Sequence, residues 1–268
     1  MDAPFAAPSA APRVELLGGA MDLVTPDEVL GRVAAAAGGG PRVLIANHNL
    51  HSLSLCRRDP QMAALYARAD LIQVDSRPAI AWGRLLGLPM TVGHRCTYLD
   101  WREAFWRLAD QNRWRVFYLG GAPGVAAEAA RRLNQRWPGA QIATHDGFFD
   151  RAPGSPDDAA VVAEIDAFAP QVLLVGMGMP LQEAWISRHY DELNAAAVLP
   201  VGAAFDYEAG VQRAAPRVLG RLGLEWLYRL AADPRRLFHR YLVEPWTLLG
   251  PAAGDLARYR LGGGRRRG

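Results

Sequence analysis

Residues 171–183 read Gln-Val-Leu-Leu-Val-Gly-Met-Gly-Met-Pro-Leu-Gln-Glu, and this is the most informative stretch of the chain. The apolar run 171–175 is typical of a strand that is buried on both faces, as the strands of a parallel sheet are. Glycines and Pro180 follow, and proline suits the first turn of a helix. The stretch therefore predicts a buried parallel strand that leads directly into a helix.

The turn between this strand and this helix is suited to an anionic ligand. Gly176 and Gly178 allow a ligand to approach the backbone closely. Gln182 and Glu183 are expected at the helix N-terminus, beside backbone N–H groups that attract anions. An ordinary strand-to-helix turn with a capping carboxylate explains the same local pattern about equally well.

Five further apolar runs have the same character: residues 43–46, 71–74, 115–119, 141–144 and 197–201. Helices are expected around them at residues 26–37, 52–58, from 60 onward, 78–86, 104–112 and 125–137, and a short strand at 14–17. This alternation predicts an α/β fold with a mostly parallel, Rossmann-like sheet and helices on both faces. Thr25 is the predicted N-cap of the first helix, because Pro26 and two acidic residues follow it.

Ligands of such sheets bind beyond the carboxyl ends of the strands. In this chain those positions hold polar residues or glycines, namely Asn47, Asn49, Asp75 and residues 120–124, 145–146, 176–183 and 202–206. The sequence thus predicts one candidate site along one edge of the sheet. His145 and Asp146 are left out of the catalytic set, because neighbouring side chains of a strand usually point apart.

Four segments are expected from the composition along the chain. Residues 1–13 are rich in Ala and Pro and are predicted to be disordered, and residues 14–206 form the catalytic core. Residues 207–250 form a helical, arginine-rich appendage, in which seven arginines alternate with aromatic and aliphatic residues. Residues 251–268 are expected to be a flexible basic tail.

Composition excludes several classes of protein. A formal charge of +3 does not call for a nucleic-acid partner, although the sequence pI is basic. Cys56 and Cys96 lack zinc spacing and are expected to be free thiols, and His48 and His51 lack a third metal ligand. No signal peptide or membrane-spanning run is recognised, so a cytoplasmic location is expected. The glycine-containing turns do not match GxGxxG, the dinucleotide-binding motif of oxidoreductases.

Several motifs carry a resemblance to a known family. They are residues 175–183, with Gln182-Glu183, then 201–210, 213–216 and 223–230. Over residues 14–245 the chain resembles the WecG/TagA/CpsF family of bacterial glycosyltransferases. The resemblance implies transfer of a sugar from a UDP-sugar to a polyprenyl-diphosphate-linked saccharide at the inner membrane face. It implies inversion at the anomeric carbon, without a metal or other cofactor.

The resemblance also suggests catalytic residues. Asp75 is the candidate general base that removes the proton of the acceptor hydroxyl. An aspartate that caps the next helix is the alternative. The family usually has Asp-Gly where this chain has Asp75-Ser76. Asn49 matches the asparagine of a family Thr-x-Asn motif, and Asn47 stands where threonine is usual. Both are expected to bind sugar hydroxyls, and helix capping is the alternative.

Other residues are expected to bind the substrates. Arg95 replaces the usual aspartate of a family motif, and its guanidinium suits a diphosphate, although a solvated surface arginine is the alternative. Donor contacts are expected from Gly120, Gly121, Gly176, Gly178, Gln182, Glu183 and Asp206. Acceptor and membrane contacts are expected from Arg213, Arg217, Arg221 and Arg229, because arginine interleaved with aromatic residues suits anionic lipid.

Rival functions remain at this point. A non-catalytic regulator or scaffold that binds a nucleotide sugar would share most of these features. A nucleic-acid binder would use the basic tail, but no reading motif supports it. The identity of the sugars and the oligomeric state are left open, and a homo-oligomer is compatible with the sequence.

Overall fold

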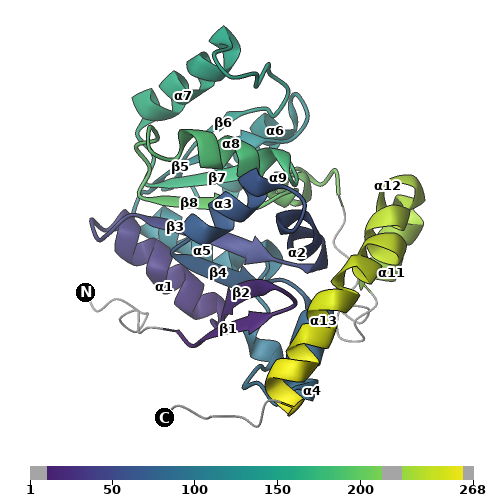
Figure 1. Cartoon of the computed structure of the whole chain (residues 1–268). Coiled ribbons are helices and arrows are strands. Elements are labelled where there is room, and N and C mark those ends of the chain that lie inside the picture. Colours follow the sequence, from purple (N-terminus) through teal and green to yellow (C-terminus); the bar gives the residue numbers. More distant parts are fainter. Residues whose placement is uncertain (1–10, 213–224, 262–268) are drawn as a thin grey trace.

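A single sheet of six parallel strands forms the centre of the protein in the computed structural model, which describes residues 11–212 and 225–261 (Figure 1). The strand order is β4-β3-β8-β7-β5-β6. These strands are β3 (Val43–His48), β4 (Leu71–Val74), β5 (Arg115–Gly120), β6 (Gln141–His145), β7 (Val172–Gly176) and β8 (Ala197–Pro200). The α/β prediction, with its parallel sheet, is confirmed.

Helices cover both faces of the sheet, as expected. Along β7, Val172 and Leu174 pack on one face, against α1 (Pro26–Ala37), α5 (Tyr98–Gln111), α6 (Val125–Arg136) and α9 (Ala204–Ala209). Leu173 and Val175 pack on the other, against α3 (Pro60–Arg68), α7 (Pro156–Phe168) and α8 (Leu181–His189). Because both sets of side chains are buried, the strand has to be apolar at every position. The predicted boundary after Asp206 falls inside α9, which packs in this core.

A hairpin and two further helices extend the core beyond β4. Strands β1 (Arg13–Leu16) and β2 (Gly19–Asp22) are antiparallel, and Asp22 accepts a hydrogen bond from the backbone of Ile72 in β4 at 2.7 Å. Helices α2 (Leu50–Cys56) and α4 (Arg77–Leu85) pack with this hairpin in a separate apolar cluster. Neither β2 nor α7 was predicted from the sequence.

The C-terminal segment is a series of short helices that runs along one side of the core, in yellow in Figure 1. It comprises α11 (Glu225–Ala232), α12 (Pro234–Phe238), η2 (His239–Val243), η3 (Glu244–Leu248), α13 (Leu249–Leu256) and η4 (Ala257–Leu261). A helical appendage was predicted. The prediction of a flexible tail from residue 251 is wrong for residues 251–261, which are helical; the remaining tail residues lie outside the described part of the chain.

Buried Asp255 explains why this segment is ordered. Its carboxylate accepts hydrogen bonds from the backbone N–H of Leu17, at 2.8 Å, and from the indole N–H of Trp82, at 3.1 Å. The hydroxyl of Tyr259 donates to the carbonyl of Glu15 at 2.8 Å. A charge buried with such partners fixes α13 on the hairpin and on α4.

Glu244 is a second buried carboxylate between the C-terminal helices and the core. It accepts a hydrogen bond from Arg58 at 3.1 Å and contacts the imidazole of His51, both of which belong to α2 or the residues just after it. Nearby, the hydroxyls of Ser54 and Thr247 are 2.9 Å apart. Polar contacts of α2 with η3 therefore complement those made by Asp255.

We expect Glu244→Ala to loosen the C-terminal helices, because Arg58 and His51 lose the buried carboxylate that they contact. The free energy of unfolding should fall by about 1–3 kcal/mol. Amide hydrogen exchange between residues 239 and 261 should become faster. Denaturant unfolding and exchange measured by mass spectrometry check the two effects.

Glu103→Ala is a matched control, since Glu103 pairs with Arg136 at 2.8 Å on the exposed surface. Removing an exposed pair should cost about 0.5 kcal/mol or less. If Glu244→Ala leaves exchange of residues 239–261 at the wild-type rate, the carboxylate does not hold these helices.

Candidate functional site

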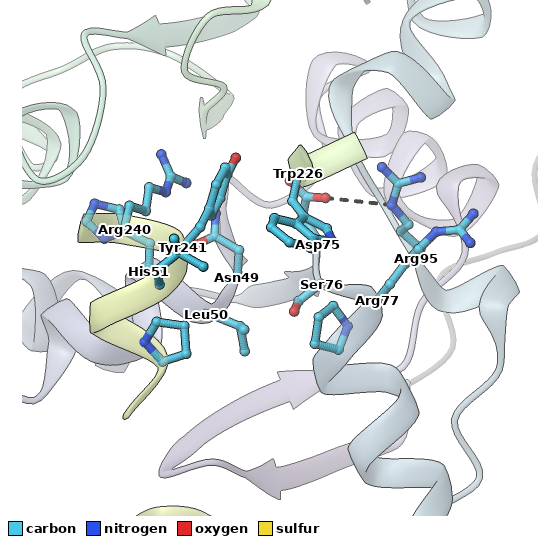
Figure 2. Close-up of a pocket in the computed structure, with 13 residues that line it drawn as sticks. Asn49, Leu50, His51, Asp75, Ser76, Arg77, Arg95, Trp226, Arg240 and Tyr241 are labelled. Carbon is cyan, nitrogen blue, oxygen red and sulfur yellow. Dashed lines mark ion pairs between the residues drawn. The ribbon is translucent and has the colours of Figure 1, made fainter. Parts of the chain in front are cut away.

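A cavity of about 290 Å³ lies between the sheet edge and the C-terminal helices (Figure 2). The core contributes residues that follow β3 and β4, together with Arg95. The C-terminal helices contribute the opposite wall. The lining residues are Asn49, Leu50, His51, Asp75, Ser76, Arg77, Pro78, Arg95, Trp226, Arg240, Tyr241, Leu242 and Pro245.

Asp75 lies directly after β4, and its backbone N–H donates to the carbonyl of His48 in the neighbouring strand at 2.8 Å. The helix-capping alternative is wrong for this residue. Ser76 is the N-cap of α4, because its hydroxyl accepts a hydrogen bond from the backbone of Ala79 at 3.2 Å. The Asp75 side chain, about 30% exposed, therefore lines the cavity without a capping role.

Arginines give the cavity a positive character around Asp75. Arg95 lies 3.8 Å from Asp75, measured from Nε to Oδ1, and a backbone bridge with Val74 holds it beside the end of β4. Arg95 is thus not the solvated surface arginine of the alternative interpretation, since only 16% of its side chain is exposed. Arg77 and Arg240 also line the cavity, and Figure 2 shows Arg240 across the cavity from Arg95. Such side chains suit phosphate groups.

Asn49 has two roles in the structure. It is the N-cap of α2, where its Oδ1 atom accepts a hydrogen bond from the backbone of Ser52 at 3.0 Å, and it also lines the cavity. Asn47 lies within β3 and is not among the lining residues. Its Oδ1 atom is buried without a hydrogen-bond partner, which is costly for an amide. The structure therefore joins Asn49, but not Asn47, with Asp75.

Gln182 connects the ends of two strands on the same edge of the sheet. Its Oε1 atom accepts hydrogen bonds from the backbone of Gly178, at 3.1 Å, and of Gly202, at 3.2 Å. Its Nε2 atom donates to Glu183 at 2.7 Å. Both side chains are buried, and neither lines the cavity. They fix the turns that follow β7 and β8.

Glu183 is a buried carboxyl group with an unusual pKa. Burial raises its pKa to about 7, although the hydrogen bond from Gln182 lowers it. Its second oxygen, Oε2, has no hydrogen-bond partner. A carboxyl group of this kind takes up a proton near neutral pH more readily than an exposed one.

The predicted glycines serve different purposes. Gly120 and Gly176 are required by strand packing, because a Cβ atom on Gly120 would lie 2.3 Å from the Gly176 carbonyl oxygen and one on Gly176 would lie 2.1 Å from the Tyr118 hydroxyl. Gly121 and Gly178 have φ of 75° and 79°, which favours glycine. A Cβ atom on Gly178 would meet open space, so this position is compatible with a ligand.

The described structure does not join the other predicted residues with Asp75. Asp206 is half-buried in α9 and does not line the cavity. Arg213, Arg217 and Arg221 lie outside the described residues, and Arg229 belongs to α11.

His51 and Arg77 also line the cavity and were not predicted as site residues. Trp226, Arg240 and Tyr241 were predicted only as part of a basic, aromatic face of the C-terminal helices. Burial lowers the pKa of His51, and Arg240 lowers it further, whereas the contact with Glu244 raises it. His51 and Glu244 are 193 residues apart, so no local pattern pointed to their contact.

The chain is similar in sequence to proteins with a named activity. Relatives from Staphylococcus aureus strains MRSA252 and NCTC 8325 are each 28% identical to the chain over 206 residues, which is 73% of this chain and 78% of theirs. Both are named N-acetylglucosaminyldiphosphoundecaprenol N-acetyl-beta-D-mannosaminyltransferase.

The profile of one family, described as Glycosyl transferase WecG/TagA/CpsF family, matches residues 14–261. This match covers the sheet, the cavity and the described C-terminal helices. The chain therefore belongs to the WecG/TagA/CpsF family of glycosyltransferases.

Proposed function

We propose that this glycosyltransferase moves a sugar from a UDP-sugar to a polyprenyl-diphosphate-linked saccharide, with inversion and without a metal. The observation that carries the proposal is the position of Asp75 in a cavity with Arg77, Arg95 and Arg240. A carboxylate can take the proton of an acceptor hydroxyl as that oxygen attacks the anomeric carbon. Guanidinium groups can neutralise the diphosphate of a substrate.

The names of the relatives support the substrate classes. They specify an N-acetylglucosaminyl-diphosphoundecaprenol acceptor and transfer of an N-acetyl-beta-D-mannosaminyl group. We assign a UDP-N-acetylhexosamine donor and an acceptor of the same lipid-diphosphate type to this chain. Its role would be the extension of a lipid-linked saccharide for a bacterial surface or exopolysaccharide.

Within this proposal, the side-chain NH₂ group of Asn49 binds the sugar hydroxyls, because its Oδ1 atom caps α2. Gln182 and Glu183 act indirectly, because they are buried: they fix the turns at Gly178 and Gly202, whose backbones would then approach the donor. Donor contacts of Gly121 and Asp206 and acceptor contacts of Arg213, Arg217, Arg221 and Arg229 remain predictions, as does a role for Asn47.

The surface of the C-terminal helices supports peripheral membrane binding on the inner face of the cell membrane. Among the described residues, no helix has the length and hydropathy needed to cross a bilayer. Large apolar side chains are nevertheless exposed on these helices: Phe238, Leu242, Val243, Trp246, Leu249 and Leu256. Exposed Arg235, Arg258 and Arg260 lie on the same segment and would attract anionic headgroups.

Asp75→Asn is expected to lower kcat by about 10²–10⁴-fold, because an amide cannot take up the proton of the attacking sugar hydroxyl. Affinity for the UDP-sugar should stay within about two-fold of wild type. Product formation from a lipid-diphosphate saccharide, followed by mass spectrometry, and donor calorimetry measure the two quantities. The anomeric configuration of the product, read by NMR, tests inversion.

Asp146→Asn is the matched control, since Asp146 follows β6 at the far edge of the same sheet. It should retain wild-type turnover. Full turnover by Asp75→Asn would remove Asp75 as the base. UDP-sugar binding without transfer to any lipid acceptor would favour the alternative, a regulator or scaffold that binds nucleotide sugars.

Stability should depend on pH through Glu183. Between pH 4.5 and about 7, the unfolded chain releases a proton that the folded protein retains on Glu183. The free energy of unfolding of wild type should therefore decrease as pH rises through this window, by up to about 3 kcal/mol relative to Glu183→Gln. Denaturant titrations at several pH values measure the difference.

Glu164→Gln changes an exposed carboxylate and is the control. Its free energy of unfolding should depend on pH as that of wild type does. The same pH dependence in wild type, Glu183→Gln and Glu164→Gln would contradict the prediction.

Membrane binding should depend on Trp246, which is 68% exposed. Trp246→Glu should weaken binding to vesicles that contain anionic lipid by about ten-fold or more, because an apolar side chain that would enter the bilayer is lost. Co-sedimentation measures the binding. Phe148→Glu changes a residue that is 73% exposed near the far edge of the sheet, and it should bind like wild type. Equal loss in both variants would argue against a specific membrane face.

A further inference from the structure

A second cavity, of about 160 Å³, lies between the C-terminal helices and the core. Its core wall comes from the hairpin, α2 and α4, and its other wall comes from η3 and α13. The lining residues are apolar throughout: Leu17, Leu50, Pro78, Trp82, Pro245, Leu248, Leu249 and Ala252. We call this cavity the apolar groove.

The apolar groove adjoins the arginine-containing cavity, because Leu50, Pro78 and Pro245 line both. On one side of these shared residues lie Asp75 and the arginines, and on the other side none of the described lining residues carries a charge. A cationic cavity and an apolar cavity therefore lie next to each other, with Leu50, Pro78 and Pro245 between their distinct parts.

The walls of the apolar groove are held in place by a buried contact. Asp255 of α13 accepts hydrogen bonds from the backbone of Leu17 and from the indole of Trp82, which lie on two different parts of the core wall. This contact joins both parts to the helix opposite. The groove is thus formed by the fold itself, with its two walls joined by this contact.

We propose that the apolar groove binds the first isoprene units of the acceptor lipid, while its diphosphate lies against the arginines of the neighbouring cavity. This inference rests on the proposed function and specifies how the acceptor is held. A lipid diphosphate consists of a charged group followed by an apolar chain. The two adjoining cavities have the same order, with arginines in the first and only apolar described residues in the second. Leu249 is 58% exposed at the groove, and it lies on the same segment as exposed Trp246, so the groove opens toward the proposed membrane face.

Binding of farnesyl diphosphate, compared with inorganic diphosphate, tests the proposal without requiring sugar transfer. Calorimetry below the micelle concentration should show that the full-length protein binds farnesyl diphosphate at least about ten-fold more tightly, because burial of the apolar chain adds to the diphosphate contact. Leu249→Glu should abolish this difference and leave the affinity for inorganic diphosphate unchanged.

Leu85→Glu is the matched control, since Leu85 is a leucine with the same exposed fraction, 58%, that lines neither cavity. It should bind farnesyl diphosphate like wild type. Equal affinities of wild type for the two ligands, or an unchanged preference in Leu249→Glu, would overturn the proposal. A wild-type dimer that Leu249→Glu makes monomeric in sedimentation, with its farnesyl diphosphate binding unchanged, would instead assign the groove to a second copy of the chain.

Transfer assays separate this proposal from the proposed function. The enzyme can be offered saccharides linked to a short alkyl diphosphate or to farnesyl diphosphate. Equally efficient sugar transfer to both would support the proposed function and refute the proposed lipid site in the groove. Preferential binding of farnesyl diphosphate that is lost in Leu249→Glu, without transfer from any UDP-sugar, would support the groove and refute the function.

Discussion

Two buried carboxylates, Glu244 and Asp255, join the C-terminal helices to the core, and both cavities depend on this contact. Glu244 meets Arg58 and His51 after β3, whereas Asp255 meets the hairpin and Trp82 of α4. A buried carboxylate without partners is unfavourable, so each one stabilises only the docked arrangement. The wall that carries Trp226, Arg240 and Tyr241 is therefore positioned over Asp75 by interactions that lie outside the cavity.

The sheet supplies the other constraint. Parallel strands place the residues that follow them on one edge, and this brings Asn49 after β3 next to Asp75 after β4. Farther along the edge, Gln182 links the turns after β7 and β8 through two backbone N–H groups. Near β4, this edge thus carries polar side chains that line the cavity. Near β7, its polar side chains Gln182 and Glu183 are buried. In the proposed reaction these parts serve the acceptor and the donor.

Much of the fold was predictable, because strands buried on both faces are apolar at every position and are punctuated by glycine or polar residues. Strand β2 was missed because Gly19-Ala-Met-Asp has little β-propensity and is stabilised by pairing with β1. Helix α7 was missed although Ser155-Pro156 is typical of a helix N-terminus. In the structure, the Ser155 side chain caps this helix by accepting a hydrogen bond from the backbone N–H of Asp157. Asp75 was an acceptable cap from the sequence, and only the structure shows that Ser76 caps α4 instead. The opposite wall was not predictable, because contacts such as His51 with Glu244 join distant residues. Catalytic and substrate-binding roles of the site residues remain predictions.

The shared wall of Leu50, Pro78 and Pro245 also bears on which lipid carriers the protein would use. A groove of about 160 Å³ encloses only the beginning of a long hydrocarbon chain. On this proposal, carriers that differ in total length but share their proximal units present the same ligand to the protein, and the distal units stay among the lipids of the bilayer. Selectivity would then lie in the saccharide and the diphosphate, and the length of the carrier would be left to the enzymes that synthesise it.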